Sequence, residues 1–264
     1  MKDISLRTQA VTRYIVPLRE GGSLPALAEA DDGFKYVVKF RGGGHGAKAL
    51  VSELIGGEIA RAAGLRVPEL VFLNLDEDFG RTEGDEEIQD LLRASRGLNL
   101  GLHFLNGSMT WDVTVNKTDA ATASRIVWID AFLTNVDRTT RNTNMLLWNH
   151  ELWLIDHGAS LYFHHSWVGW EKSMLSPFPY VKDHALLPLA SQLEETDAEM
   201  HRLITPELID RIVDLLPDTW LDEPESGLTP DDRRNVYRTF LKQRLDNSKI
   251  FVDHAIATRK QLGY

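Results

Sequence analysis

The chain has 264 residues, a formal net charge of -10 at pH 7 and no cysteine, which excludes disulfides, thiolate zinc sites and cysteine nucleophiles. The acidic balance argues against a general binder of nucleic acid or of anionic membranes, because both need a basic surface. The first residues lack the apolar stretch of a signal peptide, and no apolar run approaches the roughly 20 residues that cross a bilayer, so we expect a soluble cytoplasmic protein of one large domain or two small lobes.

The N-terminal part of the chain is typical of strands with one long helix among them. Gly21-Gly22 and Asp31-Asp32-Gly33 separate the first strand-like runs, because glycine accepts a positive φ and aspartate stabilises turns. Apolar residues at helical spacing predict a helix over 47–63, and Gly64 stands just past its end. A shorter helix is predicted at 88–94. The expected strands are 12–18, 24–28, 34–40, 67–75 and 97–105.

The C-terminal part is predicted to be mainly helical, with a small hairpin near its start. From Asp119 a broad apolar face predicts a helix, which ends at a polar stretch over 135–144. Two short strands, 145–148 and 152–155, follow and are joined by a tight turn at Asn149-His150-Glu151. Further helices are expected at 190–203, 206–215 and 230–259. Strands gathered first and helices later indicate an α+β fold rather than a doubly wound sheet.

The stretch from Asp137 to Asp156 carries the residue types that phosphoryl transfer needs. One carboxylate must orient or deprotonate the attacking hydroxyl, and Mg²⁺ prefers carboxylate oxygens, amide oxygens and water as ligands. Asp137, Asn142 or Asn144, and Asp156 supply this set. The hairpin between them would return Asp156 to the side of the loop that carries Asp137. Taken singly, the same residues are also ordinary turn formers, so the set predicts phosphoryl transfer only as a whole.

This layout of helix, polar loop, hairpin and Asp-x-Gly resembles the catalytic segments of protein kinases, phosphoinositide kinases and HipA-like kinases. The resemblance implies that Asp137 is the catalytic base and that Asp156, in Asp156-His157-Gly158, is a metal ligand. Comparison with the phosphoinositide kinases makes Asn144 the second metal ligand. The spacing in HipA proteins favours Asn142 instead, and both alternatives stay open at this point.

Segments upstream resemble the nucleotide-binding part of the same kinases. The strand Val37-Val38-Lys39-Phe40 resembles the one that bears the ATP lysine, and Ser52-Glu53 resembles the HipA helix whose Glu pairs with that lysine. An ammonium held by Glu53 would offset the charge of the α- and β-phosphates. The turn of Gly21, Gly22 and Ser23 lies where a phosphate-covering turn is expected, although a plain hairpin turn explains these residues better.

The resemblance as a whole implies a HipA-like kinase with a two-lobed, protein-kinase-like α+β fold. Its β-rich N-lobe is expected at 1–105 and its mainly helical C-lobe at 106–264, with ATP between them and the adenine near 97–106. ATP and Mg²⁺ or Mn²⁺ are the implied cofactors, and a protein serine or threonine is the implied acceptor. Two other functions fit the same residues: a degenerate kinase-like module that binds a nucleotide or a protein without transfer, and an AMP transferase that binds ATP reversed.

Two further groups of residues invite a functional interpretation. A local basic patch around Arg138 and Arg141 is compatible with the acidic chain, with Arg138 able to contact a phosphate oxygen or an activating partner. His157, His164 and His165 lie close together in the sequence. No cysteine, HExxH spacing or partner carboxylate supports a zinc site there, so we expect none.

Overall fold

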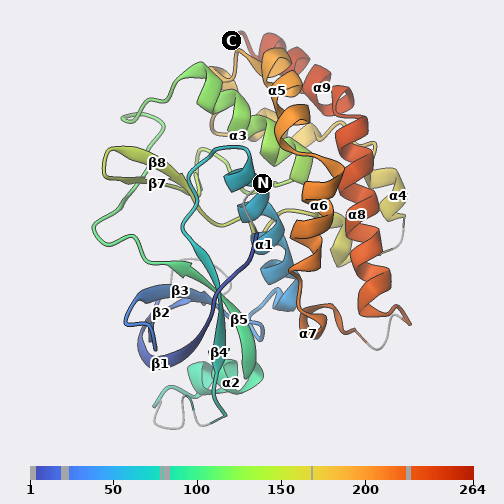
Figure 1. Ribbon diagram of the computed structural model, residues 1–264. Helices are drawn as coiled ribbons and strands as arrows, with labels where there is room; N and C mark the ends of the chain where they lie inside the picture. The colour runs from blue at the N-terminus through green and yellow to red at the C-terminus, as the bar shows by residue number, and fades with distance from the viewer. Residues whose placement is uncertain (1–3, 19–23, 78, 80–83, 168, 224–226) are drawn as a thin grey trace.

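The structure, a computed structural model, describes residues 4–18, 24–77, 79, 84–167, 169–223 and 227–264. The turn of Gly21, Gly22 and Ser23 lies outside these described residues. Within them the fold is α+β, as predicted, with the strands mainly in the first part of the chain and the helices mainly in the second (Figure 1). No helix in the described ranges is long and apolar enough to span a membrane.

Five strands close into a small barrel at one end of the molecule (Figure 1). In spatial order they are β1 (Thr8–Pro17), β2 (Ala26–Ala30), β3 (Lys35–Lys39), β5 (Gly97–His103) and β4 (Leu70–Leu75). Neighbouring strands pair antiparallel except β1 and β4, whose parallel pairing closes the barrel. The interior is filled by small and apolar side chains, among them Ala28, Tyr36 and Val38. The short helix α2 (Glu86–Ala94) precedes β5.

The alternation of side chains along β3 places Lys39 outside the barrel. Tyr36 and Val38 are fully buried in the interior, so Val37 and Lys39 face the opposite side of the strand. On that side Lys39 meets the helix α1 (Gly46–Ala62). This helix is buried on nearly all its faces, because it lies between the barrel and the C-terminal helices (Figure 1).

The C-terminal helices share one hydrophobic cluster with α1 and with the outward face of β5. Trp128 and Phe132 stack with ring centroids 5.1 Å apart, and Phe251 packs on Trp128 at 5.4 Å. The long helices of this part are α3 (Ala120–Leu133), α5 (Leu193–Leu203), α6 (Pro206–Asp214), α8 (Pro230–Asp246) and α9 (Lys249–Gln261). The short ones are η1 (Tyr162–His165), α4 (Trp170–Ser173), η2 (Pro179–Asp183), η3 (Leu187–Leu189) and α7 (Asp218–Leu221).

The predicted hairpin is present between α3 and η1. Its strands are β7 (Met145–Trp148) and β8 (Glu151–Leu154), and the short strand β6 (Met109–Thr110) pairs with β7. The turn residues Asn149 and His150 both have positive φ, 51° and 64°, as a two-residue hairpin turn with the twist of the flanking strands requires.

One predicted helix, 230–259, is wrong as a single element. It is divided into α8 and α9 at Asn247 and Ser248. Asparagine and serine compete for backbone hydrogen bonds and so favour helix ends. The side chain of Asn247 donates to the Gln243 carbonyl at 2.8 Å, which completes the end of α8.

Candidate active site

Lys39, at the end of β3, lies between two carboxylates. Its Nζ is 2.6 Å from Oε2 of Glu53 on α1 and 2.6 Å from Oδ1 of Asp156, which follows β8. The Glu53 side chain is fully buried, whereas that of Asp156 is 48% exposed. One ammonium therefore joins the barrel, α1 and the segment beyond the hairpin.

Lys39 and Glu53 hold each other in the ionised state. Burial alone would raise the pKa of Glu53, but the Lys39 ammonium and His157 outweigh burial, and the pKa is lowered to about 2. Burial also opposes the charge of Lys39, yet Glu53 and Asp156 raise the pKa of the ammonium above its ordinary value. At neutral pH the cluster is thus a fixed cation held by carboxylates.

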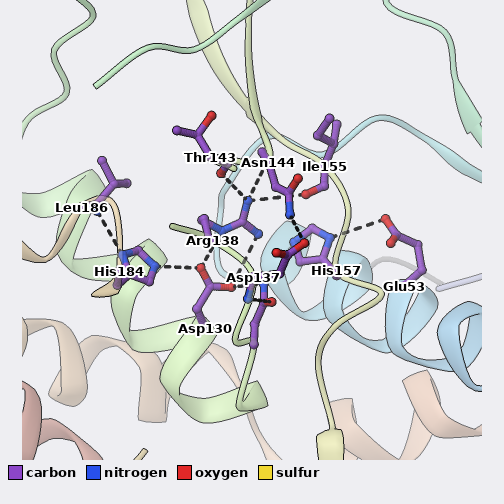
Figure 2. A network of polar contacts seen from close by, with 11 residues as sticks. Glu53, Asp130, Asp137, Arg138, Thr143, Asn144, Ile155, His157, His184 and Leu186 are labelled. Atoms are coloured by element: carbon purple, nitrogen blue, oxygen red, sulfur yellow. Dashed lines mark hydrogen bonds and ion pairs between the residues drawn. The ribbon is translucent and has the colours of Figure 1, made fainter. Parts of the chain in front are cut away.

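Asp137 lies in the loop after α3, and two asparagine amides hold its carboxylate. Asn142 Nδ2 donates to Asp137 Oδ2 at 2.8 Å, and Asn144 Nδ2 donates to the same oxygen at 3.1 Å. Figure 2 shows the Asn144 amide directed at this carboxylate. In the described part of the chain, Asp137 Oδ1 and the two amide oxygens have no hydrogen-bond partner, so all three remain available as acceptors or ligands.

These two groups face a common cavity of about 450 Å³, lined by Lys39, Asp137, Asn142 and Asp156. A second cavity of about 420 Å³ shares Lys39 and Asp156 with the first. Apolar side chains make up most of its wall: Val37, Leu102, Leu105, Leu146 and Ile155. The arrangement thus places a charged compartment beside an apolar one, with the lysine and one carboxylate between them.

Aromatic and imidazole rings also line the charged cavity. His45, directly before α1, and His165, in η1, have ring centroids 6.0 Å apart, and Tyr162 lies 5.5 Å from His165. Burial, with the charges of Lys48 and His45, lowers the pKa of His165 below its ordinary value. His165 is therefore mostly neutral at pH 7.

The structure brings the residues predicted for catalysis, nucleotide binding and metal binding together, with one exception and one correction. The exception is the Gly21–Ser23 turn, which lies outside the described residues. The correction concerns Arg138, because the prediction that it contacts a phosphate or a partner is wrong. Arg138 is only 1% exposed and its guanidinium is bonded inside the protein, so of the proposed basic patch only Arg141 is exposed.

Two residues near the loop that carries Asp137 were missed by sequence reasoning. Asp130 is buried in α3 and His184 is buried after η2, and both bind in the network around Arg138 (Figure 2). A signal for Asp130 was present, because it is the one acid in the apolar run Ile126–Leu133. An ionisable residue within such a run is a sign of a buried partner. No comparable signal marks His184.

A family model described as HipA-like kinase matches residues 11–250. Among solved structures, the chain is similar to the crystal structure of CtkA, a proinflammatory kinase of Helicobacter pylori, with a TM-score of 0.56 and 13% sequence identity over 98% of this chain and 99% of that chain. At this identity the likeness shows the fold alone. No curated protein matches the chain.

Proposed function

The chain belongs to the HipA-like kinase family, and we propose that it transfers the γ-phosphate of ATP to a serine or threonine hydroxyl of a protein. The observation that carries this proposal is the single cavity lined by Lys39, Asp137, Asn142 and Asp156. A fixed ammonium, an amide-held carboxylate and a half-exposed carboxylate are the groups that transfer from ATP uses. In this proposal 1–105 is the N-lobe, 106–264 is the C-lobe, and the two cavities lie between them.

The apolar cavity suits an adenine ring, and the charged one suits phosphates. Leu102, in β5, and Leu105, just after it, belong to the 97–106 segment where we expect the adenine, and Val37 and Ile155 supply apolar surface from β3 and from the end of the hairpin. Lys39 lies in both cavities and would contact the phosphates. We also propose that the Gly21–Ser23 turn covers the phosphates.

The charge balance of the site implies a divalent cation. The three carboxylates of Glu53, Asp137 and Asp156 stand against the one ammonium of Lys39, so ATP would meet net repulsion. In the described part of the chain, no group of three or more His, Cys, Asp or Glu side chains is placed to hold a metal ion. The ligand set that we propose therefore includes amide and phosphate oxygens beside Asp156.

Asn142 suits the amide position best, because it lines the cavity with Asp137 and Asp156, whereas Asn144 is buried at 8% exposure. Both donate their amide N–H to Asp137 and keep an oxygen without a protein partner in the described residues. Such hard oxygen donors fit Mg²⁺ or Mn²⁺. When bound, the cation would neutralise charge on the β- and γ-phosphate oxygens.

The proposed chemistry assigns the proton to Asp137. Its Oδ2 is held by the two amides, so Oδ1 is the oxygen that accepts the proton of the acceptor hydroxyl. The hydroxyl oxygen forms the new bond to the γ-phosphorus as the bond to the β-phosphate oxygen breaks, and ADP leaves. Lys39 holds the phosphates that depart, with Glu53 fixing its position.

A two-label experiment tests the function. The purified protein is incubated with Mg²⁺, a cell lysate and ATP labelled either in the γ- or in the α-phosphate. We expect protein-bound label from γ-labelled ATP only, on serine or threonine, and its absence with Asp137→Asn. Label from α-labelled ATP would identify AMP transfer instead. Nucleotide binding with no transfer of either label would identify a catalytically degenerate module.

A further inference from the structure

Arg138 follows the proposed base directly, and its side chain is fully buried. Figure 2 shows the guanidinium at the centre of a polar network. Nε donates to Asp130 Oδ2 at 2.5 Å, and Nη1 donates to the Asn144 carbonyl at 2.5 Å, with longer contacts of 3.4 Å to the carbonyls of Thr143 and Ile155. One rigid fork therefore binds the residues on both sides of the hairpin.

The carbonyls that Arg138 binds belong to the backbone that carries the candidate metal ligands. Asn144 is itself a candidate, and Ile155 directly precedes Asp156. The Ile155 N–H also donates to the Asn144 carbonyl at 3.0 Å, so the two segments are joined at this point. Asn144 and Asp156 both have left-handed backbone, with φ of 49° and 55°. Asparagine and aspartate tolerate this conformation at a cost, and surrounding contacts must hold it.

Asp130 anchors the guanidinium to α3. Its Oδ1 accepts from the Asn135 amide at 2.8 Å, and its Oδ2 lies 2.9 Å from His184 Nε2. The Leu186 N–H donates to His184 Nδ1, so the ring proton is on Nε2 and is donated to Asp130. Burial alone would raise the pKa of Asp130, but Arg138 and His184 lower it well below its ordinary value. The carboxylate is thus ionised and bonded on both oxygens.

We propose that Arg138, anchored by Asp130 and His184, is a positioning residue that holds the Asn142–Asn144 and Asp156 segments in the arrangement that binds the divalent cation. The inference rests on the proposed function of the cavity and extends it to residues that touch neither substrate nor metal. If Arg138 has this role, losing its hydrogen bonds to Asp130 and the hairpin carbonyls weakens the binding of the metal ion at the nucleotide more than it weakens the binding of the nucleotide itself. A residue that served stability alone would lower the melting temperature without changing metal affinity.

The test is Mn²⁺ binding to the full chain at saturating non-hydrolysable ATP analogue, measured by electron paramagnetic resonance. Arg138→Lys keeps the charge but cannot reach Asp130 and the hairpin carbonyls together. We expect its Mn²⁺ affinity to fall about 10- to 100-fold, the loss usual for partners that orient metal ligands. Nucleotide binding in chelator should be unchanged. The matched control is Arg233→Lys, another arginine at 1% exposure paired with a carboxylate, Glu223, and we expect it to keep parental Mn²⁺ affinity.

His184 gives a second pair of variants if Arg138→Lys does not fold. His184→Gln can still donate to Asp130 and should retain Mn²⁺ affinity, whereas His184→Leu cannot and should lose it several-fold. Parental affinity in Arg138→Lys, or in His184→Leu if the former does not fold, overturns the inference and leaves the proposed function standing. An equal loss in Arg233→Lys overturns it as well. A parental protein that binds no Mn²⁺ with the nucleotide overturns the proposed metal site and the inference together.

Discussion

Replacing Lys39 by methionine, Glu53 by glutamine, and both at once probes the ion pair on which the proposed site depends. Lys39→Met leaves a carboxylate at 0% exposure, with the imidazole Nδ1 of His157 3.7 Å from it. Removing one partner of a buried pair costs about 3–5 kcal/mol. Glu53→Gln leaves Lys39 its contact with the 48% exposed Asp156, so the loss should lie at the lower end of this range, about 3 kcal/mol. The double variant leaves no buried charge unpaired and should lose less than Lys39→Met alone.

Urea unfolding at pH 7 measures these free energies, with the exposed Lys172→Met as a control that should change little. The expected signature is a partial recovery of stability when Glu53→Gln is added to Lys39→Met. Additive losses in the double variant would refute the account, because they would mean that the two side chains do not meet in solution.

Three further predictions concern pH, metal and packing. Because the pKa of Glu53 is lowered from 4.5 to about 2, its ionisation contributes roughly 3 kcal/mol of stability that is present above pH 4.5 and lost as pH falls toward 2. The free energy of unfolding of Glu53→Gln should therefore change less with pH in that window than that of the parent. Equal pH dependence of the two proteins would contradict this. Calorimetry should show that ATP binds more tightly when Mg²⁺ is added, since three carboxylates otherwise repel the phosphates. Equal ATP affinity in chelator would contradict the proposed metal site. Gly56→Ala places a Cβ 2.6 Å from the Cβ of His157 and should lower the free energy of unfolding by about 1–3 kcal/mol, measured by chemical denaturation. The control Gly84→Ala has open space around the new Cβ and should change stability little. Equal effects of the two substitutions would mean that α1 and the Asp156 segment are not in close contact.

Much of the fold was predictable because the signals are local. Apolar runs between turn formers predicted β2 and β3, helical spacing predicted α1 and α3, and the Asn149-His150 turn predicted the hairpin that returns Asp156 to Asp137. Periodicity alone does not predict that Lys39 pairs with Glu53. That expectation came from the resemblance to kinases, and the 2.6 Å contact is what the resemblance implies.

What could not be predicted depends on contacts between distant parts of the chain. The parallel pairing of β1 with β4 closes the barrel across the whole N-terminal segment, and no local pattern specifies a partner strand. Arg138 stood in a polar loop and was expected near phosphate. It is buried instead, because Asp130 in α3 supplies an ionised partner and hairpin carbonyls supply the remaining acceptors. His184 joins them from 46 positions further along the chain.

The most direct test of the central claim is single-turnover phosphoryl transfer by Asp137→Asn, with autophosphorylation as the readout where no acceptor is at hand. The substitution keeps the size of the side chain and removes the carboxylate oxygen that accepts the hydroxyl proton. We expect ATP and Mg²⁺ to raise the melting temperature of the variant as they raise that of the parent, while the transfer rate falls about 100-fold or more. A variant that binds ATP and transfers phosphate at the parental rate would contradict the assignment of Asp137 as the base.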